Sequence, residues 1–464
     1  MLAENQDQIL WNSADLASAL GQKVVDGISA SSVSIDTRTI RPGALFIGIV
    51  GETMDGGKFA ATAFEQGAAA CILQSREQIP LQEEQRCIIV PDTMQAMEQL
   101  AVYARSRFTG QLIGVTGSVG KTSTKELLRL VLDAQGHTYA NYGTFNNHYG
   151  VPLSLANLPP DAEYAILEMG MNHAGELQAL SKLARPHVAI VTAVAPAHLE
   201  FFSSVAAIAA AKAEIFEGLE PSGKAIIDFD NPYHQILLRS ASAHGAQIIG
   251  FSQYNKSNFM LLDTKIEDGG TLVTITCNEK LYSYKLQVMG EHWVKLSMAV
   301  LATVWALEAD LEAAMYQMQN FQPPSGRGLL KKAKNGAAVI DDSYNANPAS
   351  VTASLASLAM HKKPGGRAIA ILGDMRELGK QGTQLHADLA EPIRQHKIDL
   401  VYTVGELMHS LHEALPDDVR AGHSENAAEL AAIIVPLINS TDVISIKGSK
   451  SMNMSLIVNA LVGL

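Results

Sequence analysis

Cysteine is scarce in this 464-residue chain, and long apolar runs are missing. The three cysteines, Cys71, Cys87 and Cys277, are odd in number and widely spaced, which argues against a disulfide framework or a zinc ribbon. Reduced thiols in a cytoplasmic protein are the better expectation. No stretch approaches the roughly 18 uncharged apolar residues that a membrane-spanning helix needs. We therefore expect no membrane insertion.

The chain also lacks an excess of basic residues, since 35 Lys and Arg stand against 47 Asp and Glu, a net charge of −12. Proteins that bind nucleic acid or membrane surfaces need the opposite balance, so we expect neither partner. The opening stretch MLAENQDQIL is acidic and polar, where a signal peptide would be basic and then apolar. These features predict a cytoplasmic protein, and the length predicts two to four domains.

The chain divides into three segments with different sequence patterns, and we expect domain boundaries between residues 110 and 111 and between residues 321 and 322. In residues 1–110 the runs ALFIGIV and RCIIV predict buried strands, and FAATAFEQGAAACIL predicts a helix that passes into a strand. From residue 111 the apolar runs LIGVTG, YAILEMG, VAIVTAV and KAIIDFD alternate with helical segments. Such alternation predicts a parallel sheet covered on both faces. Residues 247–288 alternate and are rich in Thr and Tyr, which predicts antiparallel strands at one edge.

The last segment begins with the linker-like FQPPSGRG and contains four further strand candidates, GAAVIDD, RAIAILGD, LVYTVG and DVISIKGS. They again alternate with helical patterns, so this segment is a second α/β unit. The predicted fold class is α/β, with a small first domain, a central domain built on a parallel sheet and a Rossmann-like third domain.

The stretch TGSVGKTSTKE, residues 116–126, is typical of a phosphate-binding loop. The common G-x-x-x-x-G-K-[ST] pattern would need a glycine at Val115, which this chain lacks. A strand precedes the loop and a helix follows it, as such loops require. Gly117 and Gly120 would let the backbone wrap an anion, Lys121 would reach the β- and γ-phosphates, and Thr122 would ligate Mg²⁺. The alternative is an ordinary strand–helix turn with a chance GKT.

Three further residues are candidates for chemistry. Glu168 stands at the carboxyl end of a predicted buried strand, where ligands of parallel sheets gather, so a Mg²⁺ ligand is one role and a loop hydrogen bond is the other. His198 follows the next strand, and Lys212 lies in an alanine-rich helical run. By itself, a single histidine is more often a hydrogen-bonded polar group than a metal ligand. A lysine on an otherwise apolar helix face is usually a surface residue whose ammonium reaches solvent.

Amide and acidic groups gather at two turns. FNNHYG carries Asn146 and Asn147, which could bind a substrate or close a turn. IDDSYNANPAS could address a ribose and a triphosphate or cap a helix, and GRG before it could place a guanidinium on phosphate. The residues concerned are Asp342, Asn345, Asn347 and Arg327.

These pieces in this order resemble the Mur ligases, which build the peptide stem of bacterial peptidoglycan, over essentially the whole chain. The carriers of the resemblance are TGSVGKTS, FNNHYGVP, LEMGMNHAGE, AHLEFF…AAKAEIF, SGRG, DDSYNANP, ILGDMRELG and IKGSKS. The loop of that family reads T-G-[ST]-x-G-K-[ST], so the missing glycine at Val115 is expected there. The first domain, with SIDTRTIRPGALFIGIVGE, is similar to the UDP-sugar-binding domain of the family.

The resemblance implies an ATP-dependent amide ligase that works through an acyl phosphate, with Mg²⁺ as cofactor. It assigns Thr122 and Glu168 to one Mg²⁺ and His198 to a second, and Lys212 matches a lysine that some relatives carbamylate. With Lys121, His198 and Lys212 form the implied catalytic set. The implied nucleotide contacts are Thr116, Gly117, Ser118, Val119, Gly120, Lys121, Thr122, Ser123, His292, Arg327, Asp342, Asn345 and Asn347. The implied substrate contacts are Thr37, Arg38, Asn146 and Asn147.

Within the family, DDSYNANP and ILGDMRELG are similar to the members that join D-alanyl-D-alanine to UDP-N-acetylmuramoyl-tripeptide. These two molecules are the implied partners, and diaminopimelate and lysine both stay open as the third stem residue. We expect a monomer. The chain departs from its relatives at Leu296, where an Asn is usual, at Lys450 and at Ser455. A sister ligase that adds one amino acid or extends folate with glutamate is the alternative, and a non-catalytic ATP-binding regulator is another.

Overall fold

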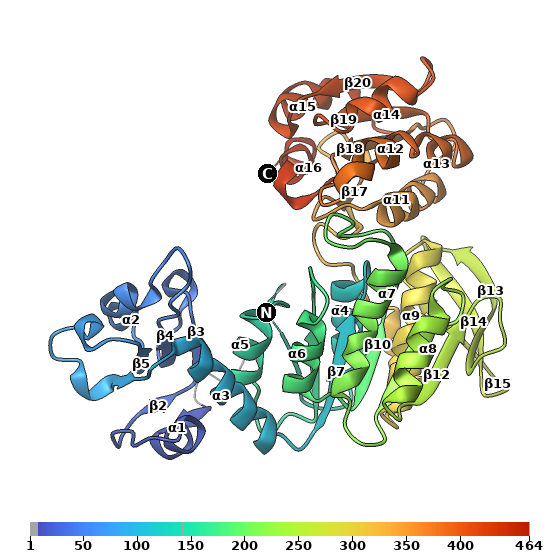
Figure 1. The fold of residues 1–464 in the computed structure, drawn as a ribbon. Coiled ribbons are helices and arrows are strands. Elements are labelled where there is room, and N and C mark those ends of the chain that lie inside the picture. The colour runs from blue at the N-terminus through green and yellow to red at the C-terminus, as the bar shows by residue number, and fades with distance from the viewer. Residues whose placement is uncertain (1–7, 142, 144, 464) are drawn as a thin grey trace.

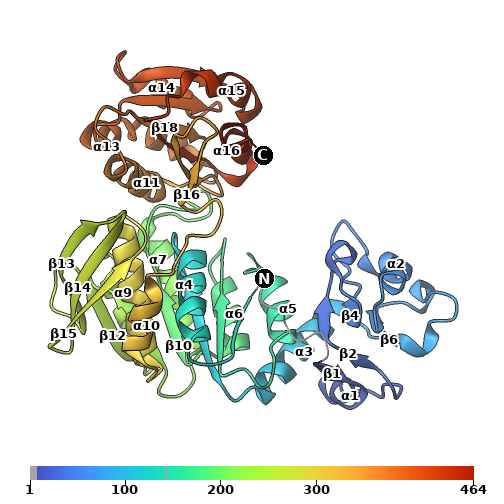
Figure 2. The same cartoon turned by 180° about the vertical axis from the view of Figure 1, so that it is seen from behind.

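The computed structural model describes residues 8–141, 143 and 145–463 and contains three α/β domains (Figures 1 and 2). The first domain extends from one side of the central domain, and the third domain stands against another side. Residues 1–7, most of the acidic opening stretch, lie outside the described residues, as do Tyr142 and Thr144 of the amide-rich segment. No helix in the described part is long and apolar enough to cross a membrane.

The first domain is built on a four-stranded parallel sheet in the order β3-β4-β5-β6, beside a small antiparallel pair, β1-β2. The strands predicted from ALFIGIV and RCIIV are confirmed as β4 and β6, and the predicted helix is α2, which ends just before Gly67 and β5. Its elements are β1 (Trp11–Asn12), α1 (Ser13–Leu20), β2 (Ser29–Ala30), β3 (Ser32–Ser34), β4 (Ala44–Ile47), α2 (Ala60–Glu65), β5 (Ala70–Leu73), β6 (Cys87–Ile89) and α3 (Thr93–Arg107).

The central domain holds a nine-stranded sheet in the order β15-β14-β13-β12-β11-β10-β7-β9-β8. Its strands are β7 (Gln111–Thr116), β8 (Thr138–Ala140), β9 (Tyr164–Glu168), β10 (Val188–Val191), β11 (Lys224–Asp228), β12 (Gln247–Ser252), β13 (Phe259–Glu267), β14 (Gly270–Cys277) and β15 (Lys280–Leu286). The antiparallel edge is confirmed for β13, β14 and β15. The predicted start of this edge, residue 247, was wrong, because β12 pairs parallel with both β11 and β13. The apolar residues of β12 belong to the buried parallel part of the sheet.

Helices cover both faces of this sheet, as near-continuous apolar strands require. They are α4 (Lys121–Asp133), α5 (Gly150–Ala156), α6 (Glu176–Ala184), α7 (Val205–Ala213), α8 (His234–Ala243), α9 (Glu291–Ala306) and α10 (Leu311–Met318). Figure 1 shows α6, α7 and α8 on one face, and Figure 2 shows α4, α9 and α10 on the other. Leu127, Leu128, Val131 and Leu132 of α4 are buried against the sheet, so the predicted apolar face of this helix is confirmed.

The third domain has a six-stranded sheet in the order β16-β17-β21-β18-β19-β20, parallel except for β16. Its strands are β16 (Leu329–Lys332), β17 (Ala338–Asp342), β18 (Ala368–Gly373), β19 (Leu400–Val404), β20 (Arg420–Ser424) and β21 (Val443–Lys447). Its helices are α11 (Pro348–Met360), α12 (Gly382–Ala387), α13 (Ala390–Gln395), α14 (His409–Ala414), α15 (Ala427–Ile434) and α16 (Ser455–Val462). All four predicted strands are present as β17, β18, β19 and β21. The carboxyl ends of β17 and β21 lie side by side, which places their last residues at one edge.

Candidate functional site

A cavity of about 1690 Å³ is lined mainly by residues of the central and third domains, and also by Glu98 and Val102 of α3 in the first domain. On the central side, the loop after β7 and the ends of β9, β10 and β11 contribute to its wall. On the other side are Arg327, the segment after β17 and the end of β21. Strand ends of two parallel sheets therefore meet in one space, which is where ligands of such sheets bind.

The loop after β7 has the backbone shape of an anion site. Gly117 has φ +153°, and a Cβ there would overlap Thr192 Oγ1, so only glycine fits. Gly120, with φ +85°, immediately precedes the first residue of α4. The first backbone N–H groups of a helix have no partner within the helix and attract anions. Lys121 Nζ donates to Gly117 O at 2.8 Å, so the lysine folds back over this loop.

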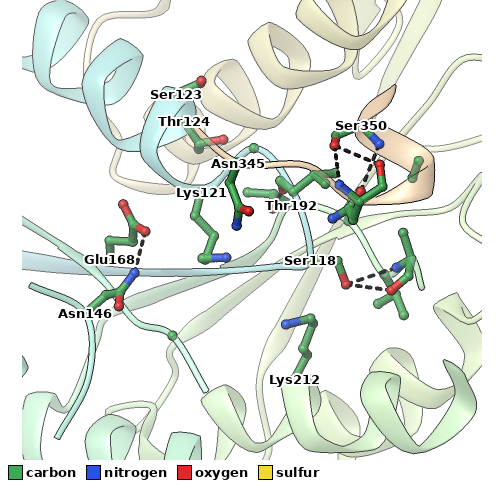
Figure 3. Close-up of a pocket in the computed structure, with 18 of the residues that line it drawn as sticks. Ser118, Lys121, Ser123, Thr124, Asn146, Glu168, Thr192, Lys212, Asn345 and Ser350 are labelled. Atoms are coloured by element: carbon green, nitrogen blue, oxygen red, sulfur yellow. Dashed lines mark hydrogen bonds between the residues drawn. The ribbon is translucent and has the colours of Figure 1, made fainter. Parts of the chain in front are cut away.

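Glu168 is buried at the end of β9 and is held by the side chains of Thr122 and Asn146; Figure 3 shows the bond from Asn146. Thr122 Oγ1 donates to its Oε2 at 2.7 Å, and Asn146 Nδ2 donates to its Oε1 at 2.7 Å. Hydroxyl and carboxylate oxygens beside a phosphate loop are the ligands that Mg²⁺ prefers, completed by phosphate and water. Thr122 and Glu168 therefore fit a magnesium ion. Among the described residues, no three His, Cys, Asp or Glu side chains gather to form a metal site, so a magnesium ion here would take its other ligands from phosphate and water.

A second layer of buried contacts fixes the position of Glu168. Asn141 is 1% exposed, and its amide bonds both the backbone N–H of Glu168, at 2.9 Å, and Phe145 O, at 2.9 Å. Lys125, which is fully buried, donates to Asn141 O at 2.6 Å and Gly143 O at 3.0 Å. The chain from α4 through residue 141 to β9 is thus one hydrogen-bonded unit.

Lys212 lies in α7, is only 2% exposed and faces the cavity. Figure 3 shows its ammonium end and that of Lys121 directed into the same space. Burial lowers the pKa of Lys212 well below its ordinary value, and the nearby positive charge of Lys121 lowers it further. Burial also lowers the pKa of Lys121, although Glu168 opposes that shift. A lysine like Lys212 carries a neutral, nucleophilic amine more often than a surface lysine does.

His198 is placed differently from the other candidates. Its Nδ1 lies 2.5 Å from Oε2 of Glu377, which belongs to the third domain, and its backbone has φ +57°. This imidazole lowers the pKa of the Glu377 carboxyl. The ring still lines the cavity, but its partner is Glu377 and not Glu168.

On the third-domain side of the cavity, Arg327 and Lys447 carry positive charge and Asp342 is the acid beside them. Lys447 Nζ lies 2.9 Å from Asp342 Oδ2 and donates to Asn345 O at 2.8 Å. The Arg327 guanidinium stacks 4.2 Å from the centre of the Tyr344 ring. Burial raises the pKa of Asp342, and Lys447 opposes that shift. Three cations, Lys121, Arg327 and Lys447, thus line one cavity, which suits a polyphosphate.

Comparison with known proteins fits this layout. The family model described as "Mur ligase middle domain" matches residues 115–304, "Mur ligase, glutamate ligase domain" matches residues 326–450, and "Mur ligase family, catalytic domain" matches residues 29–107. The UDP-N-acetylmuramoyl-tripeptide–D-alanyl-D-alanine ligase of Escherichia coli (strain K12) is 35% identical over 94% of this chain and 94% of its own. The chain belongs to the Mur ligase family.

Solved structures of Mur ligases extend the likeness to three dimensions. The crystal structure of MurF from Acinetobacter baumannii superposes with a TM-score of 0.86 at 27% identity and covers 98% of this chain and 99% of its own. MurF ligase from Thermotoga maritima, solved in complex with ADP, gives a TM-score of 0.80 at 25% identity over 93% of this chain and 97% of its own. The three-domain α/β fold predicted for this Mur ligase is confirmed.

The remaining sequence candidates divide between the cavity and other places. Ser118, Val119, Ser123, His292, Asn345 and Asn347 line the cavity. Asn347 also caps α11, since its Oδ1 accepts from Ser350 N at 2.9 Å, so the capping interpretation holds for its oxygen. Asn147 Oδ1 accepts from Gly150 N at 2.9 Å and closes the turn into α5. Thr37 and Arg38 lie in a short 3₁₀ helix of the first domain and do not line the cavity; Arg38 pairs with Asp36 at 2.6 Å.

Two polar pairs in the cavity wall were not anticipated from the sequence. One is Asp342 with Lys447, and the other is Lys295 Nζ with Asp228 Oδ2 at 3.0 Å. Lys447 and Asp228 each end a buried parallel strand. The rule that drew attention to Glu168, a charged residue at such a strand end, would have found both.

Proposed function

We propose that this Mur ligase joins D-alanyl-D-alanine to UDP-N-acetylmuramoyl-tripeptide with the hydrolysis of ATP. The observation that carries the proposal is the single cavity in which the phosphate loop of one domain faces Arg327 and Lys447 near the other domain's strand ends. The near full-length likeness to ligases named for this activity supports the choice of substrates.

The reaction begins with the terminal carboxylate of the tripeptide, which attacks the γ-phosphorus of ATP and releases ADP. Two anions must approach each other, so positive charge has to lie between them. Lys121 supplies it from the loop, with its Nζ beside Gly117 O. Arg327 and Lys447 face the same space from across the cavity. Bound Mg²⁺, held by Thr122 and Glu168, would neutralise further phosphate charge.

The acyl phosphate then meets the amine of D-alanyl-D-alanine. The amine attacks the carbonyl carbon, and the tetrahedral intermediate collapses to the amide and inorganic phosphate. Water would hydrolyse the acyl phosphate, so the site has to be enclosed. A cavity walled by the central and third domains provides such enclosure, and Lys212 lines it.

The proposal extends to the setting of the reaction. We infer that the protein acts in the cytoplasm as a monomer, that Thr37 and Arg38 contact the UDP-sugar part of the substrate, and that residues 1–110, 111–321 and 322–464 act as separate units. Breaks in secondary structure support these bounds. The first lies between Arg107 and Gln111, and the second between Met318 and Leu329.

A substrate panel tests the function. Purified protein is given ATP, Mg²⁺ and UDP-N-acetylmuramoyl-tripeptide with D-alanyl-D-alanine, D-alanine, L-lysine or L-glutamate, and phosphate release is followed with a coupled assay. We expect release with the dipeptide alone. Equal release with a lone amino acid would assign the chain to a sister ligase instead, and binding of ATP with no release in any arm would favour a regulator. Lys121→Ala serves as the inactive control.

A further inference from the structure

Two loops from different domains meet beside the cavity. One follows β10 in the central domain and holds His198, and the other follows β18 in the third domain and holds Glu377. Three contacts join them: Nδ1 of His198 lies 2.5 Å from Oε2 of Glu377, Glu200 N donates to Glu377 O at 3.1 Å, and Leu199 packs against the third-domain core. The interface between the two loops therefore combines an ion pair, a backbone hydrogen bond and apolar packing.

Both residues of the ion pair have an unusual backbone. His198 has φ +57° and Glu377 has φ +65°, a region that side-chain-bearing residues seldom adopt. Such conformations persist where surrounding contacts determine them, and they cluster at functional sites. Phe201 N donates to His198 O at 2.9 Å, which closes the turn that presents the imidazole to Glu377.

The contact with Glu377 gives the two nitrogens of the His198 ring different surroundings. Nδ1 is buried and makes no hydrogen bond of regular geometry in the described part of the chain, and the Glu377 carboxylate 2.5 Å away is the group that it faces. A carboxylate can only accept, so a carboxylate beside Nδ1 favours the tautomer that has the hydrogen on Nδ1 and the lone pair on Nε2. The ring lines the cavity, and Nε2 is the nitrogen left to act there. Carboxylates play this orienting role behind many functional histidines.

We propose that Glu377 is a positioning residue of the ligase: from the third domain it fixes the orientation and tautomer of His198, so that Nε2 faces the reacting groups only when the two domains are docked. This rests on the function proposed above. It makes the third domain complete the central site with a side chain that itself touches neither ATP nor the acceptor.

Two substitutions at 377 and one matched control test the proposal. Glu377→Ala removes the carboxylate, Glu377→Gln keeps an acceptor oxygen without the charge, and Glu200→Gln removes an exposed acid two residues after His198 in the same loop. We expect kcat for amide formation to fall at least tenfold in Glu377→Ala and less in Glu377→Gln, with KM for ATP within twofold of wild type. Glu200→Gln should match wild type.

A readout independent of turnover is the ¹⁵N spectrum of the histidine rings. Several other rings, among them His361 and His386, also carry the hydrogen on Nδ1, because that nitrogen donates to a backbone carbonyl. The His198 signal is therefore the one that disappears in His198→Gln, and we expect it to report a protonated Nδ1 in wild type and Glu200→Gln and to be lost or averaged in Glu377→Ala. An unchanged tautomer, or a Glu377→Ala enzyme with the kcat of Glu200→Gln, would overturn the positioning role. Failure of wild-type protein to turn over D-alanyl-D-alanine would instead refute the proposed function, because the ring spectrum does not depend on the substrate.

Discussion

Lys125→Met is the substitution for which the structure gives the most definite expectation. Lys125 lies in α4, is fully buried, and its ammonium donates to Asn141 O and Gly143 O. Hydrogen bonds from a charged donor contribute about 1.5–3 kcal/mol each. The two bonds together are worth roughly 3–6 kcal/mol, from which relief of burying an ammonium subtracts part. We expect a net loss of about 2–4 kcal/mol for the central domain, because methionine fills the space but leaves two carbonyls unpaired.

Urea unfolding followed by fluorescence and circular dichroism measures this loss. With a slope of about 2 kcal/mol per molar urea, the midpoint of the central-domain transition should fall by roughly 1–2 M. Arg129→Met is the matched control, since Arg129 lies one turn further along α4 with its side chain 41% exposed and pairs with Glu126 and Asp133. Such surface pairs are worth about 0–1 kcal/mol.

The same substitution should also weaken the metal site. Lys125 holds the segment whose Asn141 fixes the backbone of Glu168, so the concentration of Mg²⁺ that gives half-maximal activity should rise several-fold. A Lys125→Met protein with the urea midpoint of Arg129→Met would show that the buried ammonium does not hold this unit together. An unchanged Mg²⁺ requirement would show that Glu168 is positioned without it.

Three further outcomes are expected. Lys121→Ala should lower phosphate release by at least a thousandfold while its thermal midpoint stays within a few degrees of wild type, and wild-type kcat would refute the phosphate role. Burial lowers the pKa of the Lys212 amine, which favours its reaction with CO₂, so added bicarbonate as a source of CO₂ should raise activity by forming a carbamate. Lys212→Arg should abolish both activity and this response; an active, bicarbonate-insensitive Lys212→Arg would contradict it. Burial, aided by Lys447, lowers the pKa of His292 to about 4 from 6.5. Between these values the unfolded chain binds a proton that the folded chain does not, so the free energy of unfolding should decrease as pH is lowered through this window, by at most about 1.4 kcal/mol per pH unit. His292→Gln should reduce this slope in urea titrations from pH 7 to 4.5.

Local sequence patterns were enough to locate the strands and the phosphate loop. Val and Ile runs marked most parallel strands but not β8 (TYA) or β20 (RAGHS), which contain neither residue. Glycine spacing with a following amphipathic helix marked the anion site. Glu168 was found for the same reason, as a charge at the end of a buried strand. These features depend on residues within about ten positions of each other, so no tertiary information was needed.

Contacts between distant segments could not be read in this way. Lys447 reaches Asp342 and Asn345 across more than a hundred residues because β21 inserts beside β17, and strand order is not written in any local pattern. His198 finds Glu377 only because two domains dock. For Asn347 the sequence suited both a ligand and a helix cap, and the cap bond to Ser350 shows that its oxygen does the second task while its side chain still lines the cavity.

The hydrophobic clusters have a consequence for how ligands act on this chain. Residues on the two faces of the central sheet form two clusters, and those of the third domain form two others. The cavity lies between the central and third domains and not within the hydrophobic core of either. A nucleotide would therefore bridge two units that are already folded, and its binding free energy would restrict their relative rotation more than it consolidates either interior. Ligand affinity and domain stability can then change independently, so a substitution can loosen the bridge without unfolding anything.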